Sequence, residues 1–235
     1  RHFDTPCTQE SMALGGWAFF ESGEWYGLAL GLAPYTSQRL AGSEKHDNAS
    51  LLKSGQHGYT VLGQAYARWR GWDSQATLYR QTLETPLLNT YDVRMTPVTF
   101  EAYTFENRSL TNLVLTLSHV EKIKPWTETS FLSLSDAAGY SNTSDGITLA
   151  GVTWTCDTLS VQLWEYYAHN MANSLYAQTD FRTSESDLLV WSLSAQGLLQ
   201  RDVGAAYAGE FSAGMGGILG GLDWKGFALT LGGTV

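Results

Sequence analysis

Two oppositely charged side chains, Asp92 and Arg94, stand two positions apart in a segment that contains Pro86 and Pro97. A guanidinium at Arg94 would attract carboxylates. A carboxylate at Asp92 would attract ammonium groups or hold Arg94 in place. The alternative is an exposed Asp–Arg pair, which contributes little energy on a protein surface. The choice between the two interpretations depends on where this segment lies.

This segment joins two stretches of alternating apolar and polar residues, Gln75 to Leu83 and Val98 to Phe105. A tight hairpin needs only about two to five residues between its strands. The longer connection, with apolar and charged residues mixed, indicates a loop with a function of its own. If the flanking strands form the wall of a barrel, such a loop can fold inward and narrow the bore.

Further candidate residues lie on the stretch 59–70, where Arg68 and Arg70 share one face with Gln64 and Tyr66. If that face lines the interior of a barrel, the two arginines form part of a basic track that guides anions. The alternative places both arginines at the rim, because a short turn follows them. Arg80, near the other end of its strand, is a candidate as well.

The composition indicates an all-β chain. Of the 235 residues only 16% are charged, against about 25% in a typical soluble domain, while 13% are aromatic and 24 are glycine. No run of about 18 apolar residues could form a transmembrane helix. A net charge of −9 without a basic patch argues against a nucleic-acid partner. Neither the two cysteines nor the histidines show metal-site spacing, so no metal and no cofactor is expected.

The alternation predicts about twelve antiparallel strands joined by short and long connections in turn. The expected strands are 12–20, 26–36, 59–70, 75–83, 98–106, 110–121, 147–155, 159–168, 175–182, 188–199, 210–222 and 227–231. This alternation of connections, with many strands of ten residues or more, is typical of a transmembrane β-barrel of the outer membrane. A soluble β-sandwich that binds carbohydrate or another ligand is the alternative, since its strands have the same period with the apolar face buried.

Aromatic residues gather near the expected strand ends, as an interfacial girdle requires. They are Trp25, Tyr26, Trp69, Trp72, Tyr166, Tyr167, Tyr176 and Trp224. Glu165 does not fit, because it continues the apolar face of the strand 159–168. Either it lies at the membrane rim, where a carboxylate is tolerated, or a bulge switches faces before it.

The segment Leu78 to Phe105 resembles the OprD family of outer-membrane porins, and the resemblance extends over nearly the whole chain. It rests on a strand, a Pro-containing loop and an Asp-x-Arg-hydrophobic-x-Pro-x-Thr-Phe run. The residues that match this run are Asp92, Arg94, Met95, Pro97, Thr99 and Phe100.

The resemblance implies a passive diffusion channel for small solutes such as ions, small organic acids or amino acids. Residues 1–235 would be part of a single barrel of about 18 strands, as an internal fragment lacking one strand before it and about five after it. Loop 84–97 would be the third extracellular loop and form the pore constriction. The implied surroundings are the bilayer and lipopolysaccharide of a Gram-negative outer membrane, and the oligomeric state, monomer or homotrimer, stays open.

Some members of this family have been described as serine-type peptidases, so an enzyme is the remaining alternative. The chain contains no Gly-x-Ser-x-Gly elbow. Ser118 and His119 are adjacent, and neighbours in a strand point to opposite faces. We therefore expect no catalytic residues. The same topology separates Cys7 from Cys156 and predicts that they do not form a disulfide.

Overall fold

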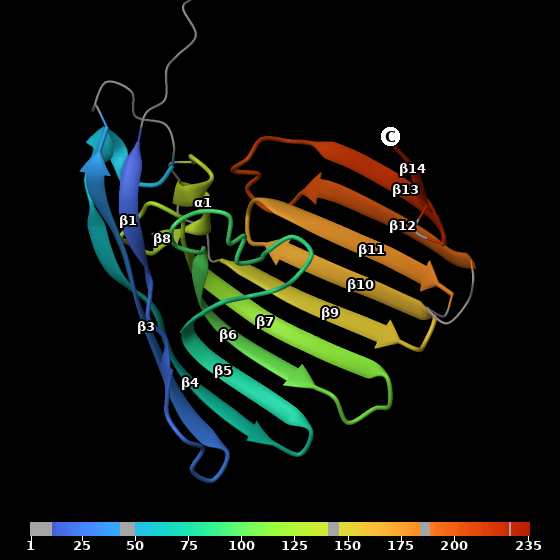
Figure 1. Cartoon of the computed structure of the whole chain (residues 1–235), viewed down its shortest axis with the longest axis horizontal. Helices are drawn as coiled ribbons and strands as arrows, with labels where there is room; N and C mark the ends of the chain where they lie inside the picture. Colours follow the sequence, from blue (N-terminus) through green and yellow to red (C-terminus); the bar gives the residue numbers. More distant parts are fainter. Residues whose placement is uncertain (1–10, 43–49, 141–145, 184–188, 226) are drawn as a thin grey trace, which may run out of the picture.

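The computed structural model describes residues 11–42, 50–140, 146–183, 189–225 and 227–235 (Figure 1). Nearly all of its regular structure is antiparallel β. The strands are β1 Met12–Trp17, β2 Phe20–Glu21, β3 Leu28–Ala41, β4 Tyr59–Gly71, β5 Ser74–Gln81, β6 Thr99–Asn107, β7 Leu113–Lys124, β8 Leu132–Ser133, β9 Ile147–Thr155, β10 Leu159–Ala168, β11 Ala172–Arg182, β12 Leu189–Asp202, β13 Ser212–Trp224 and β14 Phe227–Thr234. A 3₁₀ turn, η2 (Ser54–Gln56), and one short helix, α1 (Leu134–Ala137), lie between strands.

In the described part of the chain these strands form one 14-stranded sheet in the order β1-β3-β4-β5-β6-β7-β9-β10-β11-β12-β13-β14, with the two-residue strands β2 and β8 beside β3 and β7. Each strand of this order pairs with its predecessor in the order, so the sheet is an antiparallel meander. Short connections lie at one end of the strands, here called the turn end, and mostly longer ones lie at the other, the loop end. Figure 1 shows the sheet curling around a hollow, with β1 and β14 at its two edges.

The apolar side chains lie on the outer face of this curl, and small side chains lie on the inner face. On β3, Leu28, Leu30 and Leu32 are exposed, whereas Ala29 and Ala33 on the opposite face are buried. A soluble sandwich would bury the leucines instead. This confirms the barrel prediction and makes the sandwich alternative wrong, because a band of exposed leucines is stable only against lipid.

Aromatic rings on the inner face cover glycines of the neighbouring strand. A Cβ at Gly151 would come within 2.3 Å of the Trp164 ring, and a Cβ at Gly31 would come within 2.2 Å of the Tyr66 ring. The missing side chain lets each ring lie flat across the strand pair. Such contacts help to pin the register of a curved sheet.

Several strands extend further toward the loop end than the alternation predicted. β3 runs to Ala41 instead of residue 36, and β12 runs to Asp202 instead of residue 199. The backbone ladder continues there, since Gln38 pairs with Leu14. The side chains in these extensions are largely polar, so a prediction based on the alternation of apolar residues ends too early.

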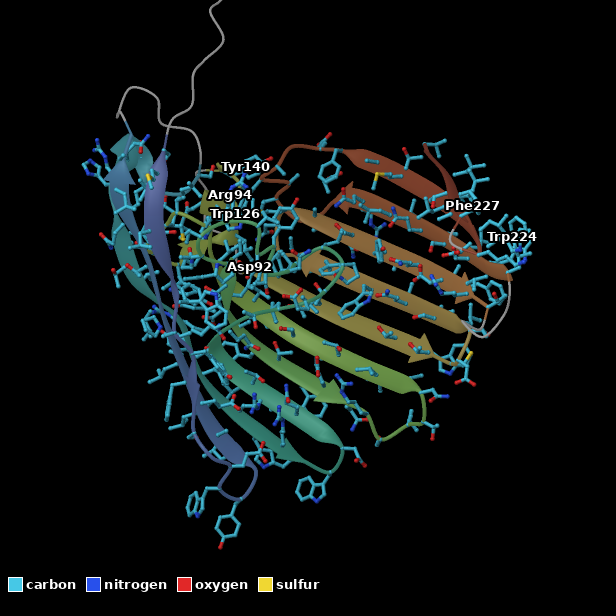
Figure 2. All side chains as sticks on the ribbon, viewed as in Figure 1. Asp92, Arg94, Trp126, Tyr140, Trp224 and Phe227 are labelled. Carbon is cyan, nitrogen blue, oxygen red and sulfur yellow. The ribbon has the colours of Figure 1, made fainter. Side chains whose placement is uncertain are left out.

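The aromatic girdle is present at the turn end. Trp25, Tyr26 and Trp72 are strongly exposed there, and Trp224 stacks on Phe227 across the turn between β13 and β14 (Figure 2). The prediction was wrong for two residues, Tyr166 and Tyr176. Both are buried, because they belong to the inner face and pack under a loop that covers it.

Glu165 lies on the outer face near the loop end of β10. This strand pairs with β9 and with β11 residue by residue without a register shift, so no bulge moves the carboxylate inward. Asn173 on β11 donates a 2.9 Å hydrogen bond to the Oε1 atom of Glu165. Of the two alternatives, the rim placement is therefore the one that the structure supports.

Cys156 is a free cysteine in the turn between β9 and β10. The other cysteine, Cys7, lies outside the described residues. The prediction that the two do not pair therefore stays a prediction.

Candidate functional site

Loop 84–97, between β5 and β6, lies across the inner face of the sheet. Leu83 and Leu88 pack into the cluster that includes Phe100, Trp164 and Tyr166. The Leu87 N–H donates a 3.3 Å hydrogen bond to the Tyr166 hydroxyl on β10. Figure 1 shows the loop spanning the hollow in front of the strands. The loop thus leaves its own strand pair and reaches β10, where its partner Tyr166 lies 79 residues after Leu87.

Hydrogen bonds within the loop give it a fixed shape. The Thr85 hydroxyl donates to the Leu88 carbonyl at 2.8 Å, and the Thr90 hydroxyl donates to the Leu83 carbonyl at 3.2 Å. The Val98 N–H donates to the Thr90 carbonyl at 2.9 Å. These bonds satisfy polar groups that the apolar contacts of the loop would otherwise bury.

Asp92 and Arg94 lie at the tip of this loop, and both are exposed. No ion pair joins them in the described part of the chain. The guanidinium of Arg94 instead lies 5.5 Å from the centre of the Trp126 ring, and Figure 2 shows the two side chains together. The structure therefore does not support the idea that Asp92 holds Arg94 in place.

Trp126 comes from the connection between β7 and β8 and anchors the loop at two points. Its ring stacks on Tyr91, with centroids 5.5 Å apart. Its carbonyl accepts hydrogen bonds from the hydroxyls of Thr96, at 2.7 Å, and Tyr59, at 2.8 Å. Sequence reasoning missed this residue, because Trp126 lies within a long polar connection and outside any alternating stretch.

The two arginines predicted to form a basic track, and the further candidate Arg80, are all paired with carboxylates. Arg68 forms an ion pair with Glu21 on β2, and Arg70 bonds Glu24 at 2.8 Å near the turn end. Arg80 bonds Glu101 at 3.0 Å. Gln64 donates to the Tyr35 hydroxyl at 2.8 Å, and the Tyr66 hydroxyl donates to Glu21. Of these residues, Arg68, Gln64 and Tyr66 face the interior, and Arg70 occupies the rim.

A cavity of about 340 Å³ lies between the base of the loop and the inner face of β4 to β10. We call it the chamber. Its walls combine Leu83, just before the loop, and Glu84, at the base of the loop, with strand residues such as Arg68, Ser118 and Trp164. Polar groups dominate the strand side, which suits contact with water and solutes.

Ser118 and His119 point to different surroundings. The Ser118 hydroxyl lies 2.8 Å from that of Thr104 in the chamber wall, whereas the Nδ1 atom of His119 lies 3.0 Å from the Thr148 hydroxyl. Among the described residues, no three His, Cys, Asp or Glu side chains are arranged to hold a metal ion. None of the described helices is long and apolar enough to cross a membrane.

The whole arrangement, a curved antiparallel sheet with an outward apolar face and an inward loop, is that of a porin wall. Residues 7–232 match the model of the outer membrane porin family OprD. The chain therefore belongs to the OprD family, as its Asp92 to Phe100 motif predicted. Membership also confirms the expected localisation, the outer membrane of a Gram-negative bacterium.

Solved structures show the same fold. OccK9 (OpdG) of Pseudomonas aeruginosa is 22% identical, with a TM-score of 0.88 over 99% of this chain and 63% of that one. OccAB3 of Acinetobacter baumannii is 14% identical, with a TM-score of 0.86 over 96% of this chain and 60% of that one. OpdK of Pseudomonas aeruginosa is 21% identical, with a TM-score of 0.84 over 97% of this chain and 62% of that one. The chain thus spans less than two thirds of these proteins, and no curated protein sequence matches it.

Proposed function

We propose that residues 1–235 are part of a single outer-membrane β-barrel that lets small solutes diffuse passively across the membrane, with loop 84–97 as its constriction. The observation that carries this proposal is the packing of Leu83 and Leu88 against Trp164 and Tyr166 on the inner face. A loop fixed across the bore reduces its cross-section. A narrow point is where charged or polar groups can select among solutes.

In this proposal Arg94 and Asp92 act at the constriction. Both are exposed at the loop tip, so both can meet a passing solute. Arg94 attracts carboxylates and Asp92 attracts ammonium groups. The Trp126 ring holds the guanidinium in position without neutralising its charge.

The partners we propose are the bilayer with its lipopolysaccharide, on the leucine face, and small solutes, on the inner face. One matching structure is of Pseudomonas aeruginosa OpdK with vanillate, which supports a solute of that size. Catalysis is not part of the proposal, because Ser118 and His119 bond to different partners.

The test is the conductance of the complete barrel in a planar bilayer, compared with a variant in which residues 86–96 are replaced by a short Gly-Ser link. The shortened loop should raise the single-channel conductance at least about twofold, because it removes the obstruction. A control variant with a substitution in the outward turn Trp72-Asp73 should conduct as the original. Absence of conductance steps from correctly folded protein would contradict the channel. An unchanged conductance in the shortened variant would contradict the proposal that loop 84–97 forms the constriction.

A further inference from the structure

Three charged side chains, Arg80, Glu101 and Lys122, form a cluster at the loop end of the sheet. They are register partners on the neighbouring strands β5, β6 and β7. These strands lie inside the sheet, away from its edges at β1 and β14. The cluster is therefore complete within the described part of the chain.

The cluster belongs to the outer face of the sheet. Leu78 and Tyr103, which are exposed, lie two positions closer to the turn end than Arg80 and Glu101. Residues two positions apart in a strand share a face. Ala102, between Glu101 and Tyr103, packs instead into the inner cluster under loop 84–97. The charged groups thus continue the apolar outer face toward the loop end.

The height of the cluster matches the level of lipid head groups. β5 begins beside Trp72 of the turn-end girdle and rises about 3.3 Å per residue with a tilt of about 35–45°. Arg80 therefore stands roughly 20 Å above that girdle, and the apolar band of such barrels is about 25 Å tall. Longer connections mark the loop end as the extracellular side. The lipid on that side is lipopolysaccharide, whose lipid A anchor carries phosphate groups.

One carboxylate in the cluster holds two cations. The Nε and Nη2 atoms of Arg80 both donate to the Oε1 atom of Glu101 at 3.0 Å, and the Nζ atom of Lys122 lies 3.1 Å from Oε2. The Glu101 side chain is 7% exposed, whereas that of Lys122 is 48% exposed. The negative charge is thus covered, and the positive charge of the cluster is at the surface.

Aromatic rings keep the guanidinium of Arg80 in place. Its carbon atom lies 4.2 Å from the centre of the Phe131 ring and 5.1 Å from that of Tyr79. Its Nη1 atom donates a 3.4 Å hydrogen bond to the Leu62 carbonyl. These rings leave the positive charge intact. A guanidinium that is already fixed loses little freedom when it binds a phosphate.

The surrounding polar groups include one that opposes an anion and several that suit a sugar. Glu121, next to Lys122 in the chain, is exposed and forms no ion pair among the described residues, so it lowers the local positive potential. Further along the same boundary, the Thr148 hydroxyl lies 3.0 Å from Nδ1 of His119 and 3.1 Å from Nε2 of His169. Such groups can exchange hydrogen bonds with sugar hydroxyls.

We infer that Arg80 and Lys122, held together by Glu101, bind a phosphate group of lipopolysaccharide in the outer leaflet. Phosphate oxygens form strong charge-assisted hydrogen bonds with guanidinium and ammonium groups, and basic clusters at the membrane surface recognise anionic head groups. The inference rests on the proposed function, because it places the cluster in a complete barrel, and it locates one of the proposed partners on named residues.

The experiment is native mass spectrometry of the complete barrel in mild detergent, titrated with purified diphosphoryl lipid A. The original protein should bind this lipid at least about fivefold more tightly than lipid A stripped of both phosphates, and more tightly than phosphatidylglycerol. Lys122→Gln keeps the Arg80–Glu101 pair and should weaken binding about fivefold, the effect of losing one charge-assisted contact. Adding Arg80→Gln should weaken it further, and Glu121→Gln should strengthen it.

Arg108→Gln is the matched control, since it removes an exposed arginine that also pairs with a glutamate, but at the turn end. It should leave lipid A binding unchanged. Heat-dependent gel mobility checks that each variant is folded, and Lys122→Gln alone decides the test if the double variant does not fold.

Three results would overturn the inference: equal binding of lipid A without phosphates, equal binding of phosphatidylglycerol, or unchanged binding by folded Lys122→Gln. Conductance in a planar bilayer separates this inference from the proposed channel. Conductance steps without phosphate-dependent lipid binding would overturn the inference alone. Phosphate-dependent lipid binding without conductance steps would support the inference and contradict the channel.

Discussion

The indole N–H of Trp126 donates a 2.9 Å hydrogen bond to the carbonyl of Tyr91, and the two rings stack on each other. This relationship joins two connections that are distant in the chain. The tip of loop 84–97 is held from above by the connection after β7, and its base is held by the aromatic residues of β10. The loop is thus fixed at both ends of its path across the hollow.

Replacing Trp126 should loosen the loop tip. The Trp126→Ala variant loses an aromatic stack of about 1 kcal/mol and a cation–π contact of about 0.5–1 kcal/mol. Single-channel recordings of the complete barrel should then show a noisier open current and a larger mean conductance. Trp126→Phe is the control, since it keeps a ring for stacking and lacks the N–H. Currents from Trp126→Ala that are as quiet as those of the original would contradict the anchoring role.

Replacing Arg94 should change selectivity without changing the fold, because the side chain is exposed at the loop tip. Under a salt gradient, Arg94→Ala should shift the reversal potential toward cation preference. Arg94→Lys keeps the charge and should shift it much less. Asp92→Asn should move it in the opposite direction from Arg94→Ala. If Arg94→Ala leaves the reversal potential where it was, the guanidinium does not face the pore.

Gly151 should tolerate no side chain. Its Cβ would lie 2.3 Å from the Trp164 ring, which is itself held in the cluster under the loop. Gly151→Ala should therefore lower the free energy of unfolding by about 1–3 kcal/mol, the usual effect of overpacking. Gly220→Ala is the matched control, since no atom lies within 4 Å of a Cβ there. Urea titration followed by tryptophan fluorescence would compare the two, and equal midpoints would argue against the contact.

The strand pattern could be predicted because strands that cross a membrane must present an apolar face to the lipid. Leu28, Leu30 and Leu32 alternate with Ala29 and Gly31. Only this arrangement of the strand places the apolar side chains against lipid and the small residues toward the hollow. The prediction ended early where strands continue beyond the membrane, as at Gln38, because water requires no apolar side chains. The period of two in the side-chain pattern predicts the register and the face of each strand. It does not predict the length of the strand.

The candidate site was harder to predict, because its properties depend on pairs between distant segments. The alternation put Arg68 on a face with Gln64 and Tyr66, which is correct. It did not indicate that Glu21, from a two-residue strand, would neutralise the guanidinium. Trp126 likewise acquires its role only when loop 84–97 folds back over the sheet. Such contacts have no local signal in the sequence.

The two faces of β7 provide a direct test of which side meets lipid. Leu117 is 54% exposed on the outer face, and its neighbour Thr116 lines the chamber. A lysine on the lipid face costs about 2–4 kcal/mol near the bilayer midplane and less toward the interfaces, whereas a lysine in the lumen remains hydrated. Leu117→Lys should therefore destabilise the complete barrel in liposomes, as measured by urea unfolding. Thr116→Lys should leave the free energy of unfolding nearly unchanged and lower the cation-to-anion permeability ratio. The reverse order of stabilities would mean that the leucine face does not contact lipid.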